Sequence, residues 1–340
     1  AAARDNSRLL TTQNGSPPPL LNSKFSYGLD DGSELTITLN AVDSPEAEDP
    51  GALTRSEVGQ DRKQAAPRNV LFDAGEELDQ QTLGLAYGKT LGANHRLDVR
   101  NYYVVRDFQN RLPFDVNSNG QGGRVRLDRF FAGAGGQYSY SGSLLGKANR
   151  LVVGLDLDAQ RDGRRRYANE EGVQGAKTTD QDEHVTSYGA YFQDELGIAT
   201  DATLTFGLRY DRVDYDVDDN LTSDGSGDTD FDEISPLAGL VWSPGPAVNL
   251  YGNIAGSFDP PTTTELANPR GTSGFNTGLR PQKATNYEIG AKGLVTGRLR
   301  YELALFRIDV DDELVSYELA GSGQSFFENA ASSEHKGLES

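Results

Sequence analysis

The chain has 340 residues with 32 basic and 51 acidic side chains, which gives a net charge of −19. A surface this negative argues against nucleic acid as a partner, because phosphates require a basic face. Cysteine is absent, which excludes disulfides, thiolate metal sites and a thiol nucleophile, and no run of eighteen apolar residues offers a transmembrane helix.

Stretches in which every second residue is apolar recur along the chain, as expected for strands with one apolar face. Residues 1–23 are polar and contain three consecutive prolines, so we expect coil there. After them, pairs of strands are predicted around short turns. These pairs lie at residues 24–29 and 34–42, 83–87 and 97–105, 125–142 and 148–162, 184–197 and 202–217, and on both sides of residues 243–246 and 295–298.

Long polar connections are predicted between these hairpins. They lie at residues 43–75, 110–122, 163–182, 218–230 and 312–324. Within the first of them, a short helix is predicted at residues 54–64, with Thr54 as its N-cap. About thirteen strands are therefore expected, with short and long connections in alternation.

This alternation is typical of membrane β-barrels, which have short turns on one side and long loops on the other. We therefore predict an all-β fold, a transmembrane antiparallel β-barrel with all its short turns at one end. These turns lie near Asp31, Gly92, Gly146, Thr200, Gly245 and Gly297. The mean hydropathy of −0.57 fits a barrel, because only alternate strand residues meet lipid. A propeller would repeat about every 40 to 50 residues, and no such repeat is present.

The strand at residues 202–217 shows the expected division into two faces. Its apolar and polar side chains alternate, with Leu204, Phe206 and Leu208 between Thr203, Thr205 and Arg209. The first three are predicted to face lipid and the other three the lumen. Aromatic residues at strand ends are predicted to form an interfacial girdle, although in a soluble β-sandwich they would pack in the core. They are Tyr103, Tyr191, Tyr210, Tyr251, Tyr287 and Tyr301.

Four sequence blocks in residues 258–339 carry a resemblance to a known family. They are Phe-Asp-Pro-Pro-Thr-Thr-Thr-Glu-Leu (258–266), Leu-Arg-Pro-Gln-Lys-Ala-Thr-Asn-Tyr-Glu-Ile-Gly-Ala-Lys (279–292), Phe-Arg-Ile-Asp-Val (306–310) and Asn-Ala-Ala-Ser-Ser-Glu-His-Lys-Gly-Leu-Glu (329–339). In this order they resemble the late barrel region of TonB-dependent outer-membrane receptors. The first block has an extra residue between Pro261 and Glu265, and Gln282 stands where that family usually has glutamate. Residues 187–195 and 207–211 are also similar to barrel strands of the family.

The resemblance implies a barrel of about 22 strands in the outer membrane of a Gram-negative bacterium. An N-terminal plug closes such a barrel, extracellular loops capture the ligand, and the TonB complex supplies energy through the plug. Residues 49–55 look like a segment of the ferric citrate and siderophore branch, which implies a ferric siderophore or similar metal chelate as ligand. Outer-membrane lipid and lipopolysaccharide are the implied surroundings. Because the chain has neither end of the family pattern, residues 1–340 are expected to be one barrel domain, incomplete at both ends and without the plug.

Candidate ligand-binding residues are Arg164, Arg165, Arg166 and Tyr167, at the start of the connection predicted for residues 163–182. Guanidinium groups match the carboxylates of an anionic iron chelate, and a long extracellular loop is where a receptor would present them. The same cluster would also suit ion pairs with acidic loops or with lipopolysaccharide.

No catalytic motif is present, so an enzyme is not expected. The three histidines are far apart in sequence, and no metal site or cofactor is predicted from them. An aspartate-rich segment has the oxygen ligands that calcium prefers, but it lacks the glycine and final glutamate of an EF-hand, which favours a solvated acidic loop. Its members are Asp216, Asp218, Asp219, Asp224, Asp228, Asp230 and Asp232.

Three alternatives remain open from the sequence. One is a passive porin-like or adhesive barrel that does not use TonB. Another is a soluble secreted β enzyme, which would require paired carboxylates or a triad. The third keeps the receptor but changes its ligand to cobalamin, a nickel chelate or a glycan.

Overall fold

The computed structural model describes residues 20–117, 120–221, 225–266, 276–295, 299–318 and 325–340. Two short helices, α1 (Arg55–Gln60) and α2 (Pro67–Leu71), accompany fifteen strands in this part of the chain. The strands are β1 (Leu20–Gly28), β2 (Glu34–Glu48), β3 (Gly75–Leu91), β4 (His95–Val116), β5 (Gly122–Leu144), β6 (Lys147–Glu170), β7 (Val173–Gly197), β8 (Ala202–Asp219), β9 (Gly227–Gly245), β10 (Val248–Asp259), β11 (Gln282–Val295), β12 (Leu299–Asp311), β13 (Leu314–Glu318), β14 (Ser325–Asn329) and β15 (Ser332–Glu339).

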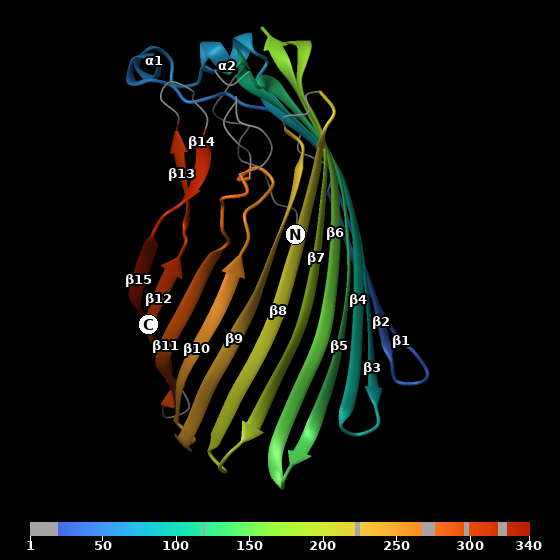
Figure 1. Cartoon of the computed structure of the whole chain (residues 1–340), viewed down its shortest axis with the longest axis vertical. Helices are drawn as coiled ribbons and strands as arrows, with labels where there is room; N and C mark the ends of the chain where they lie inside the picture. The colour runs from blue at the N-terminus through green and yellow to red at the C-terminus, as the bar shows by residue number, and fades with distance from the viewer. Residues whose placement is uncertain (1–19, 118–119, 222–224, 267–275, 296–298, 319–324) are drawn as a thin grey trace.

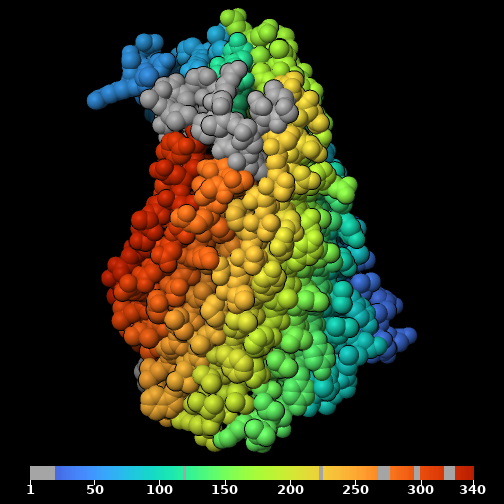
Figure 2. All heavy atoms as spheres, in the orientation of Figure 1, coloured from blue at the N-terminus to red at the C-terminus, as the bar shows by residue number. Residues whose placement is uncertain are grey.

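Thirteen of these strands form one antiparallel sheet in which each strand pairs with the next along the chain, from β1 to β12 and then β15. The pair β13–β14 forms a separate two-stranded sheet. The large sheet is curved and forms a continuous wall (Figures 1 and 2). Among the described residues β1 and β15 each pair with one strand only, so the sheet is open. The predicted all-β barrel fold is confirmed. Neither described helix is long and apolar enough to cross a membrane.

The predicted hairpins are confirmed, and their short turns lie together at the lower end of the wall (Figure 1). Both helices and the β6–β7 turn lie at the opposite end. The turns near Asp31, Gly92, Gly146, Thr200 and Gly245 therefore follow the predicted topology, whereas Gly297 lies outside the described residues.

Two of the predicted polar connections are wrong, because strands continue through them. Strand β4 runs to Val116 and β5 begins at Gly122, which leaves little of the connection predicted at residues 110–122. The connection predicted at residues 163–182 is a hairpin with a tight turn at Glu171 and Gly172, whose φ angles are 47° and 91°. In these parts of β4 to β7, which lie at the upper end of the wall, both faces of the sheet carry polar residues. The alternation that marks a half-buried strand is therefore lost while the backbone pairing continues.

The helix predicted at residues 54–64 is present but ends at Gln60. Thr54 is its N-cap, as predicted, and forms a capping box with Glu57. Sequence reasoning missed α2, which begins with Pro67 at its first turn and is only five residues long. At the other end of the chain, the loop predicted at residues 312–324 contains β13.

The two faces of the wall differ as the alternation predicts. Leu204, Phe206 and Leu208 are 37%, 41% and 40% exposed, and they share a face with the residues directly opposite on β9. Thr205 and Arg209 lie on the other face and are half-buried. The predicted division of β8 between two faces is therefore confirmed.

Long-range contacts identify the polar face as the concave, inner one. Arg100 of β4 reaches Asp156 of β6 at 2.7 Å across Gly135 of β5, which lies directly between them. Tyr102 of β4 likewise donates a hydrogen bond to Asp158 of β6. Both contacts pass over a glycine of β5, and a sheet that curves toward this face brings such side chains together, so this face lines the interior.

Of the six tyrosines predicted to form the aromatic girdle, three lie on the outer face, where a girdle requires them. Tyr103, Tyr210 and Tyr287 are exposed on the outer, apolar face. By contrast, Tyr191 and Tyr251 lie on the inner face. Each lies over the glycine directly opposite, Gly154 and Gly290 respectively. Tyr301 donates a hydrogen bond to the carbonyl of Ala247 at 3.2 Å, beside the β9–β10 turn.

We expect Gly154→Ala to destabilise the protein by about 1–3 kcal/mol, because the added methyl group would overlap the Tyr191 ring. Gly84→Ala is the matched control, since its methyl group would meet Thr38 Cβ at an ordinary 3.6 Å. Both substitutions reduce the conformational freedom of the unfolded chain equally. The difference between their free energies of unfolding therefore isolates the effect of the overlap with Tyr191. Urea unfolding of the folded protein in detergent measures it. Equal midpoints for the two variants would show that Tyr191 does not need the glycine.

Candidate functional site

The four residues predicted to bind ligand lie on strand β6 and not on a loop. Strand alternation separates them. Arg164 and Arg166 are on the inner face, while Arg165 and Tyr167 are on the other. Arg165 is 2.8 Å from Asp128, and the Tyr167 ring is 5.9 Å from the guanidinium of Arg126. The predicted placement on a loop is therefore wrong, and the four side chains do not converge on one ligand.

The structure instead brings together inner-face residues from five neighbouring strands. In the backbone pairing, Gln80 of β3 lies opposite Arg106 of β4, which lies opposite Arg129 of β5. The same line continues to Asp162 of β6 and Glu183 of β7. Residues directly opposite on antiparallel strands have adjacent side chains on one face, so these five form a continuous polar line.

Two carboxylates in this line are buried and held by arginines. The Asp162 side chain is fully buried and accepts two hydrogen bonds from Arg129, at 2.8 and 2.5 Å. The Glu183 side chain is 4% exposed and accepts a hydrogen bond from Arg164 Nε at 2.6 Å. Burying two adjacent carboxylates is costly unless each has a cationic partner, and these bonds supply the partners.

Two further inner arginines have no carboxylate partner in the described part of the chain. Arg106 Nε donates to Gln80 Oε1 at 2.7 Å. Arg166 donates to the carbonyl of Gly122 at 3.0 Å and to Gln121 Oε1 at 2.6 Å. Burial lowers the pKa of Arg166 to about 10, and the charge of Arg164 contributes. Arg166 lies beyond the outer apolar residues of β6 and remains protonated at neutral pH.

Arg106, Arg129, Arg164 and Arg166 together form what we call the inner arginine cluster. Four guanidinium groups face two carboxylates there, so the cluster is locally positive in a chain of net charge −19. Sequence reasoning identified two of its members but missed Arg106 and Arg129. Neither belongs to a basic run, and only the strand register brings them beside β6.

Residues 260–266, after β10, and residues 276–281, before β11, pack against the inner face close to this cluster. Leu266 and Leu279 are 0% and 3% exposed and pack with Tyr215 of β8. Thr263 Oγ1 donates a hydrogen bond to Glu183 Oε2 at 2.8 Å, so the same carboxylate is shared with Arg164. The end of the block at residues 258–266 therefore packs on the inner face of the wall, through Thr263 and Leu266.

A second inner-face group lies nearer the short turns and is balanced in charge. Asp156 is 2.7 Å from Arg100 and 3.1 Å from Arg209, and Arg209 also pairs with Asp211 at 2.7 Å. Arg100 and Asp156 border a recess of about 370 Å³ that Tyr191 also lines. Since each cation has a carboxylate, this group stabilises the wall and offers no free charge to a ligand.

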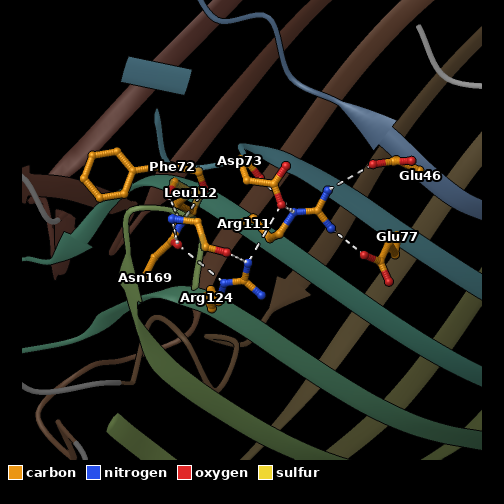
Figure 3. A network of polar contacts seen from close by, with 9 residues as sticks. Glu46, Phe72, Asp73, Glu77, Arg111, Leu112, Arg124 and Asn169 are labelled. Carbon is orange, nitrogen blue, oxygen red and sulfur yellow. Dashed lines mark hydrogen bonds and ion pairs between the residues drawn. The ribbon is translucent and has the colours of Figure 1, made fainter. Parts of the chain in front are cut away.

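A third polar network holds the connection between β2 and β3 against the upper ends of β4 to β7 (Figure 3). Arg111, whose side chain is 9% exposed, donates to the carbonyl of Asp73 at 2.7 Å and pairs with Glu77. Asn169 donates to the carbonyls of Phe72 and Leu112, both at 2.9 Å. These groups are saturated by backbone and carboxylate partners, so their role is structural.

The aspartate-rich segment lies mostly on strands. Asp216, Asp218 and Asp219 belong to β8, and Asp228, Asp230 and Asp232 belong to β9. The acidic loop predicted at residues 218–230 is therefore shorter than expected, and Asp224 lies outside the described residues. Within the described ranges, no three His, Cys, Asp or Glu side chains are placed to share a metal ion.

A family model described as TonB dependent receptor-like, beta-barrel matches residues 7–340. The catecholate siderophore receptor Fiu of Escherichia coli K12 is 30% identical over 153 residues, which cover 38% of this chain and 20% of that protein. Among solved structures, the unliganded ferric citrate transporter FecA has a TM-score of 0.73 at 19% identity, over 93% of this chain and 46% of that one. The closed form of Fiu from E. coli K12 has a TM-score of 0.65 at 16% identity, over 94% of this chain and 55% of that one.

The chain thus spans about half the length of these solved structures, and the match to the curated Fiu receptor covers 20% of that protein. At such low identity the solved structures establish the fold alone. The family model, in contrast, covers almost the whole sequence. The chain therefore belongs to the TonB-dependent receptor-like β-barrel family.

Proposed function

We propose that this chain is the barrel wall of an outer-membrane receptor that imports a ferric siderophore or similar metal chelate. The observation that carries this proposal is the inner arginine cluster. It places four guanidinium groups on the interior of the wall, two of them without carboxylate partners among the described residues. Guanidinium forks bind carboxylate and other oxyanions in a bidentate manner, so an anionic chelate is the complementary ligand.

The relatives support the same class of ligand. One is named a catecholate siderophore receptor and another a ferric citrate transporter. Their names describe those proteins, and for this chain they favour an iron chelate over cobalamin or a glycan. Location in a Gram-negative outer membrane and contact with its lipids are part of the proposal. The outer apolar face of β8 and its neighbours fits that location.

We also infer that further strands complete this wall. Unpaired strand edges are not tolerated in hydrocarbon, and β1 and β15 each have a free edge in the described residues. The length of the solved relatives leaves room for these strands and for a plug domain. Energy for uptake would reach the barrel from the TonB complex through that plug.

Uptake of radioactive iron as ferric citrate and as a ferric catecholate, by cells that express the complete receptor, tests the proposal. We expect uptake of one of them, and its loss in a strain that lacks TonB. Arg106→Ala combined with Arg166→Ala should weaken binding about a hundredfold or more, because each of the two lost charged hydrogen bonds contributes about 1.5–3 kcal/mol. These two changes leave no buried carboxylate unpaired, so the barrel should still fold.

The matched control is Arg212→Ala, which removes an exposed arginine that pairs with Asp214 on the outer face. It should leave uptake unchanged. Undiminished uptake without TonB would favour the passive barrel instead. Full binding by the double variant would exclude the inner arginine cluster as the ligand site.

A further inference from the structure

The backbone pairing between β9 and β10 stops partway up the wall. Its last directly opposite pair is Leu237 and Ala255, whereas β9 continues upward beside β8 as far as Gly227. Residues 227–235 therefore pair on one side only, with residues 209–217 of β8. Within the described ranges the wall thus forks between β9 and β10, and β10 ends below the upper end of the wall (Figure 1).

Pro236 is the reason that the pairing stops at this point. A proline has no backbone N–H and is tolerated in a strand only where that side needs no partner. A Cβ added to Gly256 of β10 would lie 3.0 Å from Pro236 Cδ, so the proline ring stands between the two strands where an N–H would donate. A recess of about 270 Å³ marks the fork, and Pro236, Gly256 and Lys283 are among its lining residues. Beside it, Lys283 of β11 forms an ion pair with Glu233 of β9.

The free edge of β9 lies beyond the apolar residues of the outer face. Tyr210 of β8 and Ile234 of β9 are directly opposite each other and are the last large apolar side chains of this face on the two strands. Unpaired backbone groups are not tolerated in hydrocarbon, but above this level they meet water. An edge of unpaired N–H and C=O groups in water is a template for a further strand.

Carboxylates line the outer side of this edge. Asp228, Asp230 and Asp232 alternate along β9, and Asp216 of β8 lies directly opposite Asp228. Arg212 pairs with Asp230 at 3.3 Å, whereas the other three have no ion pair in the described part of the chain. Because no three of these described carboxylates are placed to share a metal ion, a row of separate cationic side chains is the complementary partner.

The inner side of the same edge is apolar. Phe231, between two of the aspartates, points to the other face and packs against the buried cluster of Tyr215, Leu266 and Leu279. Residues directly opposite on neighbouring strands have adjacent side chains. A strand added to this edge therefore places alternate residues beside the aspartates and beside Phe231.

We propose that the free edge of β9 binds an extended segment of a partner protein in which basic and apolar residues alternate. The segment lies antiparallel to β9 and pairs with the backbone of residues 227–235, with its cations at the aspartates and its apolar side chains at Phe231. Charges at a strand edge disfavour pairing with other strands, so the aspartates restrict the site to strands of opposite charge. The site is separate from the inner arginine cluster and needs no iron chelate.

The test measures binding of the labelled peptide Lys-Val-Lys-Val-Lys-Val-Lys to the complete receptor in detergent, by fluorescence anisotropy at low salt. The parent should bind this peptide about tenfold more tightly than its counterpart with glutamate in place of lysine. A copy methylated at its backbone nitrogens keeps the charges but loses the hydrogen-bond donors, and it should also bind about tenfold more weakly.

Asp228→Asn combined with Asp232→Asn should weaken binding of the lysine peptide about fivefold, because two exposed ion pairs are lost. The matched control is Asp43→Asn combined with Asp79→Asn. It removes two directly opposite carboxylates from the outer face of β2 and β3, away from the free edge, and should leave binding unchanged. Heat-modifiable gel migration confirms that each variant is folded.

Disulfide trapping distinguishes strand addition from simple attraction to the carboxylates. The chain has no cysteine, so Asp228→Cys and the directly opposite Asp216→Cys each introduce one thiol, on β9 and β8 respectively. An added strand lies next to β9 and one strand further from β8. Peptides in which one lysine is replaced by cysteine should therefore cross-link to Asp228→Cys about tenfold faster than to Asp216→Cys.

Four results would overturn the proposal: no binding of the lysine peptide by the parent, equal binding of its methylated copy, parental affinity in the variant that lacks the charges of Asp228 and Asp232, or equal cross-linking at β8 and β9. Each of them leaves the proposed function intact, because iron uptake is tested at the inner arginine cluster. Conversely, a receptor that imports no iron chelate but binds the lysine peptide at β9 would support this inference alone.

Discussion

Arg129→Ala is expected to destabilise the barrel wall by about 3–5 kcal/mol, because it leaves the buried Asp162 without its guanidinium partner. The Asp162 side chain is 0% exposed, and water cannot replace the two hydrogen bonds that Arg129 donates. Gln160 Nε2, at 3.0 Å, would remain as a neutral donor and cannot neutralise the charge. Urea unfolding of the protein in detergent, followed by the fluorescence of Trp242, measures the loss.

Two controls separate this effect from the loss of any arginine. Arg212→Ala removes an exposed pair with Asp214 at 2.8 Å, and its effect should be much smaller because water screens that pair. Arg129→Leu together with Asp162→Leu removes both charges and should recover most of the stability, because no buried charge is left unpaired. If Arg129→Ala unfolds at the same urea concentration as Arg212→Ala, Asp162 is not held in the way described.

The hairpins could be predicted from the sequence because each uses local signals. Alternating residues such as Leu204, Phe206 and Leu208 indicate a strand with one apolar face, and Asp31-Gly32 indicates a turn. The N-cap at Thr54 is equally local, since a capping box needs only Thr54 and Glu57. These predictions depend on residues a few positions apart, and all of them are confirmed.

The upper parts of β4 to β7 could not be predicted in the same way. There the strands extend beyond the outer apolar residues, and both faces carry polar side chains. Arg165, for example, pairs with Asp128 on one face while Arg164 pairs with Glu183 on the other. Sequence without alternation resembles a loop, and the connection predicted at residues 163–182 was wrong for this reason.

The inner arginine cluster illustrates a second limit. A run of three arginines suggests one binding patch, but residues at consecutive positions on a strand point to opposite faces. The residues that do meet, Arg106, Arg129 and Asp162, are more than twenty positions apart in sequence. Their meeting depends on the register of two strand pairs, which no local signal in the sequence reveals.

The inward and outward faces of the wall are the basis of every proposal made for this chain. Adjacent substitutions on β8 test them most directly. Phe206, 41% exposed, lies within the outer apolar residues of this strand, and its neighbour Thr205 lies on the inner face. A charge on the lipid face costs about 2–4 kcal/mol near the middle of the bilayer and less near its edges, whereas a lumen position tolerates it.

The measurement is refolding of the complete receptor into lipid vesicles, followed by heat-modifiable gel migration and urea titration, for Phe206→Arg and for Thr205→Arg. We predict a loss of about 2–4 kcal/mol for Phe206→Arg and near-parental stability for Thr205→Arg. The reverse order, or equal stability for the two variants, would contradict the assignment of the apolar face to lipid and the arginine-bearing face to the lumen.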